Sequence, residues 1–132
     1  MSDGWSVVNT AEVPDPSGDF PGEMRMLGPA ADAEQISFTY RRLAPGSHSF
    51  PRPGHGHWHR TQEEVYFVLT GRVRFKLDDE EVTVGPLTAV RVAPPVTREL
   101  FNDGDSDAEY VIVSTRAEDL RSEAEIVPEF WS

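Results

Sequence analysis

The stretch HWHRTQEEVYFVLTG, residues 57–71, contains the pattern that decides the fold of this chain. His57 and His59 stand two positions apart, so on a strand both imidazoles project from the same face. Glu64 follows after four further residues, which is enough for a turn into a neighbouring antiparallel strand. The apolar run after it ends at Gly71. The stretch therefore predicts two adjacent strands that bring two histidines and one carboxylate together.

Strand patterns continue on both sides of this stretch. Alternating apolar and polar side chains, typical of half-buried strands, recur in short segments that cover 36–41, 73–77, 82–84, 90–92, 97–101 and 109–114. Asp78-Asp79 predicts a tight turn that joins two of these segments into a hairpin. Only residues 116–124 have a helical pattern. Roughly seven or eight short strands predict an all-β sandwich or small barrel with a short C-terminal helix.

Residues 1–34 have a different character. They contain VPDPSGDFPG and LGPAADAE, with proline and glycine every few residues and little periodicity. We expect an irregular N-terminal arm that packs on the barrel through Trp5, Val7 and Phe20. Residues 35–132 are then a single β-barrel domain with a C-terminal tail, and a length of 132 residues suits one domain.

Charge and composition exclude several classes of protein. The chain has 23 acidic and 12 basic residues, a formal net charge of −11, which opposes binding to nucleic acid or to an anionic membrane. The absence of cysteine excludes disulfides and thiol chemistry. No signal-peptide pattern is present and the longest apolar run is 65–69, so we expect a cytoplasmic protein. Residues 35–98 alone are net positive, which suits a small anionic ligand.

Two imidazoles and one carboxylate form the three-ligand set of open metal sites. His57, His59 and Glu64 are therefore candidate ligands of a divalent transition metal. Nitrogen and oxygen donors without sulfur suit Mn, Fe(II), Co, Ni or Zn. The competing interpretation is that the histidine pair lies in a solvated, glycine-rich turn and binds no metal.

The spacing H-x-H-x4-E-x6-G in residues 57–71 resembles the first motif of the cupin superfamily. Residues 85–102, GPLTAVRVAPPVTRELFN, are similar to the second motif, in which a histidine precedes an asparagine by four positions. The first glycine and Asn102 fit, whereas Pro51 replaces the leading glycine of the first motif and Arg98 stands in place of the histidine. The resemblance implies an antiparallel double-stranded β-helix, or jelly-roll barrel, with a metal inside it.

Arg98 is the main departure from the cupin pattern. A guanidinium stays protonated and cannot coordinate a cation, so the fourth ligand that the resemblance implies is missing. Three interpretations remain open. The metal has three protein ligands; or Arg98 pairs with Glu64 in a barrel without metal; or Arg98 binds an anionic group of the substrate beside the metal.

Other side chains are candidates for contact with a bound molecule. Tyr40, Tyr66 and Phe101 lie on predicted strands and are candidate substrate-binding residues, with plain core packing as the competing interpretation. His55 continues the two-residue spacing of the histidines, so it is either an additional ligand or a residue at the rim of the barrel. His48 is interpreted as a surface residue.

The cupin resemblance implies a protein that binds or acts on a small molecule. Cupins of this size include dioxygenases, isomerases and decarboxylases, so the first hypothesis is a metal-dependent dioxygenase or isomerase acting on a small anionic substrate. No catalytic residue beyond the metal ligands is assigned. The alternative is a non-catalytic, metal-free small-molecule-binding or structural cupin in which Arg98 pairs with Glu64. A third hypothesis, an acidic partner-binding module, rests on the net charge alone.

The run 65–69 is apolar at every position, whereas a strand with one wet face should alternate. Its second face needs a cover. The candidates are the N-terminal arm, the C-terminal Phe130-Trp131 and a second copy of the chain. Because homodimers are the commonest small assembly, we expect a homodimer.

Overall fold

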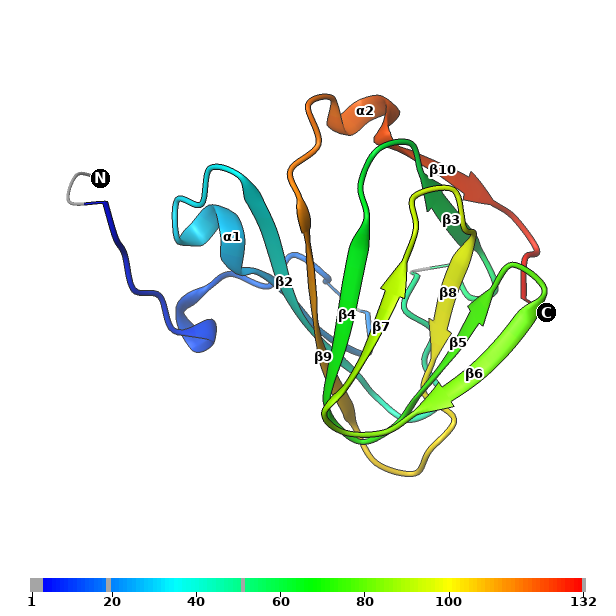
Figure 1. Ribbon diagram of the computed structural model, residues 1–132. Coiled ribbons are helices and arrows are strands. Elements are labelled where there is room, and N and C mark those ends of the chain that lie inside the picture. The colour runs from blue at the N-terminus through cyan, green and yellow to red at the C-terminus, as the bar shows by residue number, and fades with distance from the viewer. Residues whose placement is uncertain (1–3, 19, 51, 132) are drawn as a thin grey trace.

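Two five-stranded antiparallel sheets face each other in the computed structural model, which describes residues 4–18, 20–50 and 52–131 (Figure 1). Sheet A has the strand order β1 (Gly22–Met26), β2 (Ile36–Leu43), β9 (Ala108–Thr115), β4 (Glu64–Thr70) and β7 (Thr88–Val92). Sheet B has the order β10 (Ala124–Val127), β3 (Gly56–His59), β8 (Arg98–Phe101), β5 (Val73–Leu77) and β6 (Glu80–Val84). This architecture confirms the predicted all-β jelly-roll barrel.

The predicted strand segments are present as β2, β4, β5, β6, β7, β8 and β9. The predicted hairpin is β5–β6, in which Val73 pairs with Val84 at one end and Leu77 with Glu80 at the other. Asp78 in its turn has a φ of 52°, the left-handed conformation that aspartate tolerates better than most residues. Local alternation and turn chemistry therefore agree with the tertiary structure over most of the barrel.

One expectation of strand pairing is wrong. The sequence predicts that the strand of the two histidines neighbours the strand that begins at Glu64. In the structure β3 lies in sheet B between β10 and β8, whereas β4 lies in sheet A between β9 and β7. The connection 60–63 thus crosses from one sheet to the other. As a result, the histidines and the glutamate meet across the interior of the barrel and not along one sheet.

The N-terminal arm contains more regular structure than its sequence predicts. It holds a 3₁₀ turn (Thr10–Glu12), the strand β1 and a short helix, α1 (Leu27–Ala30). β1 pairs with β2 along its whole length and so extends sheet A at its edge. At Gly22 a Cβ would lie 2.1 Å from the carbonyl oxygen of Arg42, so only glycine permits this close approach. A division of the chain at residue 34 therefore separates two strands of the same sheet.

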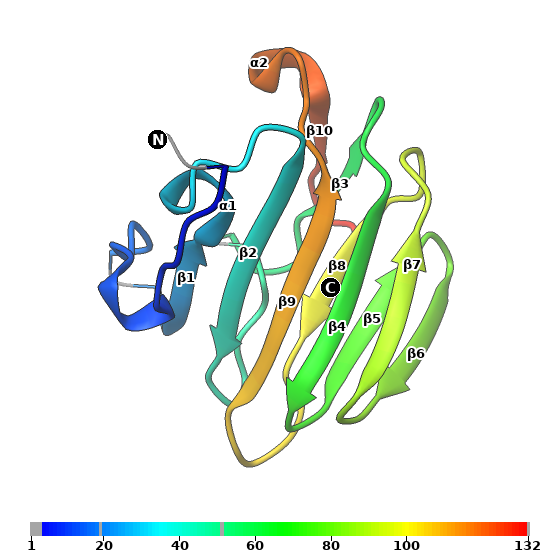
Figure 2. The ribbon, with the colours of Figure 1, turned by 60° about the vertical axis from the view of Figure 1, so that its left-hand side comes forward.

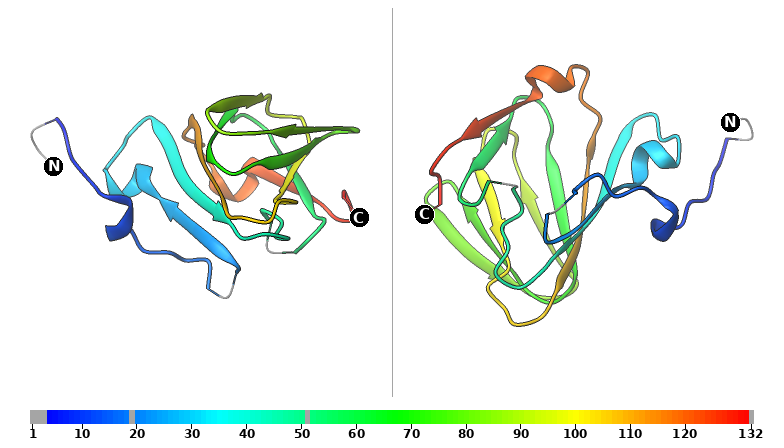
Figure 3. Two further views of the ribbon diagram at one scale, coloured as in Figure 1. Left: turned by 90° about the horizontal axis from the view of Figure 1, so that it is seen from below. Right: turned by 180° about the vertical axis from the view of Figure 1, so that it is seen from behind.

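The C-terminal segment forms a helix and one further strand. The helix α2 (Leu120–Glu123) lies within the predicted segment 116–124 but is shorter, because β10 begins at Ala124 and pairs with β3. In Figure 3 the N-terminal and C-terminal segments lie on opposite sides of the barrel. In the described part of the chain, no helix is long and apolar enough to cross a membrane.

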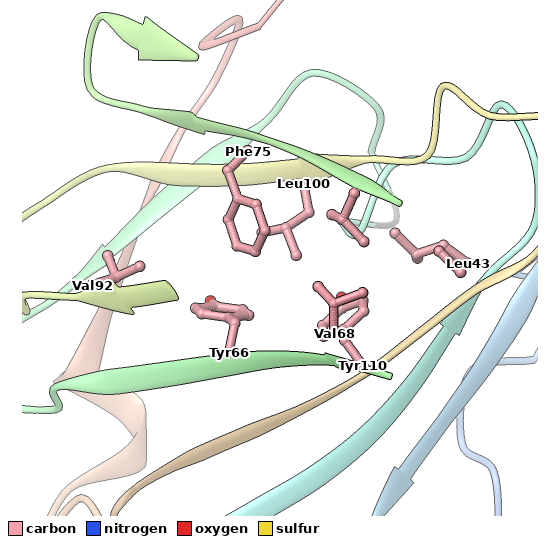
Figure 4. Close-up of a cluster of buried hydrophobic side chains, with 9 residues drawn as sticks. Leu43, Tyr66, Val68, Phe75, Val92, Leu100 and Tyr110 are labelled. Carbon is pink, nitrogen blue, oxygen red and sulfur yellow. The ribbon is translucent and has the colours of Figure 1, made fainter. Parts of the chain in front are cut away.

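The apolar core lies between the two sheets (Figure 4). It consists of fully or almost fully buried side chains from both sheets, namely Leu43, Tyr66, Val68, Val73, Phe75, Val92, Leu100, Ala108 and Tyr110. Tyr66 packs edge-on against Phe75, with ring centroids 5.4 Å apart. Each large apolar side chain that is buried in this way contributes about 1.5–3 kcal/mol. The core therefore joins the sheets and holds the strand ends around the candidate site in place.

The strand register decides which side chains face the interior. On β4, Tyr66 and Val68 are buried, whereas the alternate Phe67 is only half-buried on the outer face. Arg41 on β2 is paired with Tyr110 on β9 and so faces the interior. Figure 2 shows β2, β9, β4 and β7 side by side in sheet A. Ile36, Phe38 and Tyr40 consequently lie on the outer face of β2, whereas Thr39, Arg41 and the buried Leu43 face inward.

Candidate metal centre and its cavity

The structure brings His57, His59 and Glu64 together inside the barrel. One ligand atom from each residue lies within 4.8 Å of the others. The two histidines stand on one face of β3, as the two-residue spacing predicts, and Glu64 is the first residue of β4 in the opposite sheet. Three candidate ligands from two sheets therefore converge on one point.

The carboxylate of Glu64 has two different surroundings. Its Oε1 accepts hydrogen bonds from Nη1 of Arg98, at 2.8 Å, and from the hydroxyl of Tyr66, at 2.6 Å. Its Oε2 lies 3.6 Å from Nε2 of His59. Burial is the main cause that raises the pKa of Tyr66 well above its usual value, so this hydroxyl stays protonated and can donate a hydrogen bond. One oxygen is thus held by the protein and the other faces the histidines.

Arg98 is completely buried. Besides Glu64, its guanidinium donates from Nε to the carbonyl of Val96 at 3.0 Å and from Nη2 to the carbonyls of Ala93 and Pro94 at 2.8 and 3.2 Å. The side chain does not line the cavity described below. Of the three interpretations of Arg98, the structure contains the pairing with Glu64.

A residue that sequence reasoning missed, Glu123 at the end of α2, holds His59 in place. Its Oε2 lies 3.3 Å from Nδ1 of His59 and accepts from the amides of Thr61 and Gln62 at 3.0 and 2.9 Å, while Oε1 accepts from the Thr61 hydroxyl at 2.6 Å. Burial opposes ionisation, but these hydrogen bonds lower the pKa of Glu123 to about 2. The predicted helix 116–124 was the only sequence signal near this residue.

Because the Glu123 carboxylate only accepts hydrogen bonds, Nδ1 of His59 is the donor in this contact. In the neutral imidazole this leaves the lone pair on Nε2, the atom that faces Glu64. Burial is the main cause that lowers the pKa of His57 to about 4, so the imidazole of His57 is neutral at pH 7. A neutral imidazole has a nitrogen lone pair and is the form in which histidine binds metals.

The surroundings of His59 Nε2 fit a cation. This nitrogen is buried and has no hydrogen-bond partner among the described residues. It faces a carboxylate oxygen at 3.6 Å, and two electron-rich atoms at that distance repel each other unless a proton or a cation lies near both. A divalent transition metal on His57, His59 and Oε2 of Glu64 would satisfy all three donors. Arg98 already neutralises Glu64, which weakens the attraction for the cation.

The candidate ligands open onto a cavity of about 440 Å³ between the sheets. Its wall is mainly apolar and includes Tyr66 from the predicted substrate-binding set. Part of the wall comes from the N-terminal arm, through Pro16, Ser17, Phe20 and Met24. This volume lies within the range of small-molecule sites. The arm therefore forms part of the wall around the candidate metal centre.

Two predicted substrate-binding residues lie elsewhere. Tyr40 is on the outer face of sheet A, where its hydroxyl donates to Glu109. Phe101 is on the outer face of sheet B and packs against His48 and Trp131, with ring centroids 4.6 and 6.1 Å away. Successive strand residues point to opposite faces, so the neighbours of these aromatics, and not the aromatics themselves, reach the interior.

The remaining histidines do not join the centre. His55 stacks on Phe50, with ring centroids 6.0 Å apart, and lies outside the group of candidate ligands. This position corresponds to the rim of the barrel. His48 is partly buried, with Nδ1 3.4 Å from a carboxylate oxygen of Glu99. Pro51, the departure from the first motif, lies outside the described residues.

Two antiparallel sheets that close around a histidine–glutamate centre define a double-stranded β-helix barrel with a candidate metal site. The chain belongs to the cupin family, because the family model described as "Cupin domain" matches residues 39–114. No curated protein sequence gave a match.

Solved structures with the same fold have diverse names. The polyketide cyclase RemF from Streptomyces resistomycificus has a TM-score of 0.73 at 17% identity, with 96% of this chain and 86% of that chain covered. A sugar phosphate isomerase of the cupin superfamily from Silicibacter pomeroyi has a TM-score of 0.71 at 20% identity, with 84% of this chain and 76% of that chain covered. A protein described as a predicted oxalate decarboxylase from Thermotoga maritima has a TM-score of 0.69 at 21% identity, with 84% of this chain and 99% of that chain covered. These likenesses concern the fold alone.

Proposed function

We propose that this cupin binds a divalent transition metal through His57, His59 and Glu64 and acts as an enzyme on a small anionic molecule in the adjoining cavity. The observation that carries the proposal is the buried Nε2 of His59, which has no hydrogen-bond partner among the described residues and faces Oε2 of Glu64. Three protein ligands would leave coordination positions free for a bound molecule. The metal would supply Lewis acidity or an oxygen-binding centre when bound.

Of the two predicted reaction types, the cavity favours a dioxygenase over an isomerase. An isomerase that moves a proton needs a positioned base with a pKa near neutrality. Among the described residues that line the cavity, the only carboxylate and the only imidazoles are the three candidate ligands. Burial raises the pKa values of the lining Tyr66 and Tyr110, so both stay protonated. Chemistry that depends on the metal and not on a protein base fits this wall best.

The residues of the chain prepare the centre in three ways. Glu123 fixes the ring of His59, Arg98 and Tyr66 fix the carboxylate of Glu64, and the N-terminal arm forms one wall of the cavity. Such support of metal ligands by hydrogen bonds typically changes metal affinity or activity by about 10- to 100-fold.

A second candidate function follows from the ion pair between Arg98 and Glu64. In this reading the guanidinium takes the place of the metal, and the protein is a non-catalytic cupin that binds a small molecule. The complete burial of Arg98 and its four hydrogen bonds support it.

Metal analysis of untagged protein distinguishes the two functions. Cells are grown with Mn, Fe, Co, Ni and Zn, and the purified protein is measured by inductively coupled plasma mass spectrometry. The metal-dependent function requires near-stoichiometric metal in the wild type and its loss in His57→Ala, with His55→Ala as a matched control that keeps the metal. Metal-free wild-type protein that also fails to take up any of these ions on titration would establish the second function.

We also propose that the chain forms a homodimer through the outer apolar face, defined as Phe38, Val65, Phe67, Leu69, Val111 and Val113. These residues are neighbours in the register of β2, β9 and β4, and they are half-buried or exposed in the single chain. A continuous apolar face on a sheet is typical of a protein–protein interface, and a twofold pair would cover both copies. The cytoplasmic location stays a prediction.

A further inference from the structure

A second polar pair faces the cavity, apart from the candidate metal ligands. Arg41 on β2 and Tyr110 on β9 are direct partners in the sheet register, and both line the cavity wall. Neither takes part in the hydrogen bonds that support His59 or Glu64. The pair therefore needs its own explanation.

The hydroxyl of Tyr110 is an unused hydrogen-bond donor in the interior. The side chain is fully buried, and its oxygen has no hydrogen-bond partner among the described residues. An unpaired buried hydroxyl costs free energy, and most buried polar groups in native proteins are paired. Burial raises the pKa of Tyr110, so the hydroxyl stays protonated and can donate a hydrogen bond.

Arg41 brings a positive charge to the same wall. Its Nη2 donates to the carbonyl of Ser49 at 2.9 Å, and the ring of Phe20 lies 5.3 Å from its Cζ. Its Nε is buried and has no hydrogen-bond partner in the described ranges. No described carboxylate lies within 4.0 Å of this guanidinium, whereas Arg25, Arg42 and Arg98 each have one.

The charge balance of the cavity then favours a monoanion. Glu64 is neutralised by its buried ion pair with Arg98. Glu99 does not line the cavity; it accepts a hydrogen bond of 2.5 Å from the hydroxyl of Ser49, and burial raises its pKa to about 7. Among the described residues of the wall, Arg41 is therefore the charged side chain that has no oppositely charged group in contact with it.

We propose that Arg41 and Tyr110 bind the carboxylate of the ligand, which is a monocarboxylic acid with an apolar or aromatic body. A guanidinium and a phenol on one wall match the two oxygens of a carboxylate. The rest of the wall, which includes Phe20, Phe50 and Leu100, suits an apolar body. This ligand class rests on the proposed function, because the monocarboxylic acid is the anionic molecule that would occupy the same cavity.

The test is isothermal titration calorimetry with benzoate, with hexanoate as an aliphatic probe and benzamide as a neutral probe of the same shape. The protein is treated with EDTA, so binding to a metal does not contribute. Arg41→Gln and Tyr110→Phe remove the charge and the hydroxyl. Arg42→Gln and Tyr40→Phe are matched controls, since these neighbouring residues point to the outer face of the same sheet.

The expected result is that benzoate or hexanoate binds the wild type and benzamide binds at least about tenfold more weakly. Arg41→Gln weakens carboxylate binding by about 10- to 100-fold and Tyr110→Phe by about tenfold, while both controls bind like the wild type. Tyr110→Phe without ligand has a melting temperature equal to or above that of the wild type, because the unpaired hydroxyl is gone. A purely structural role of Tyr110 predicts the opposite.

The proposal is overturned if neither carboxylate binds folded wild-type protein at millimolar concentration, if benzamide binds as tightly as benzoate, or if Arg41→Gln binds as tightly as Arg42→Gln. These outcomes do not depend on metal content. Failure of the metal proposal appears instead in the metal analysis, where His57→Ala and the wild type would both be metal-free.

Discussion

Nη1 of Arg98 donates a hydrogen bond of 2.8 Å to Oε1 of Glu64, and Arg98 has no solvent exposure at all. The same carboxylate directs its other oxygen towards His59. One glutamate therefore belongs both to a buried ion pair and to the candidate metal centre. Changes at Arg98 should affect the stability of the barrel and the affinity for metal in opposite ways.

Removal of Arg98 alone should destabilise the fold. In Arg98→Met the carboxylate of Glu64 stays buried without its counter-charge, and the expected loss is about 3–5 kcal/mol of unfolding free energy. The double variant Arg98→Met/Glu64→Leu should recover most of this loss, because it leaves no unpaired charge. Urea denaturation of the metal-free proteins measures both values. Equal destabilisation of the single and double variants would contradict an energetic role of the pair.

Arg98→His should tighten metal binding by about tenfold or more, because it removes a positive charge and adds an imidazole to the ligand set. Competition against a chromogenic chelator measures the affinity. Arg98→Gln is the control, since it removes the charge without adding a ligand and should give a smaller increase. If Arg98→His binds metal no better than the wild type, position 98 does not adjoin the metal.

Glu123→Gln should weaken metal binding by about 10- to 100-fold, because the ring of His59 loses the carboxylate that fixes its tautomer and orientation. The electronic spectrum of the cobalt-substituted protein should change as well, which a purely structural loss would not cause. Glu125→Gln, two residues along on the exposed strand β10, is the matched control and should behave like the wild type.

Glu99 should make the fold less stable as the pH rises. Burial raises its pKa in the folded protein from 4.5 to about 7. Between these values the folded state keeps a proton that the unfolded state has lost, so the free energy of unfolding falls with increasing pH, by up to about 3 kcal/mol. Below pH 4.5 and above pH 7 this contribution is constant. Thermal melts of the wild type and Glu99→Gln from pH 4 to 8 should diverge in this window; parallel curves would refute the shift.

Phe67→Glu should convert a dimer into a monomer, because it places a charge in the centre of the outer apolar face. Light scattering after size-exclusion chromatography gives the mass. Val82→Glu on β6 is the control, since Val82 is exposed on the edge strand of the other sheet. A wild-type protein that is monomeric at high micromolar concentration would contradict the interface.

Much of the barrel could be predicted because its signals are local. The alternation along β5 and the Asp78-Asp79 turn of the β5–β6 hairpin act over a few residues, and both appear in the structure as predicted. The two-residue spacing places His57 and His59 on one face of β3 for the same reason. The edge strands β1 and β10 were missed, because both are short and depend on pairing with β2 and β3.

The sequence by itself determined the cupin barrel, the two histidines and the glutamate at its centre, and the alternative that Arg98 pairs with Glu64. Only the tertiary structure decided that Glu123 supports His59 from 64 residues away and that Arg41, not Tyr40, faces the cavity. The alternation on β2 predicts the apolar residues inside, but the register with β9 turns them outward. A strand pattern defines two faces and not which one is covered, because that depends on the sheet packed opposite.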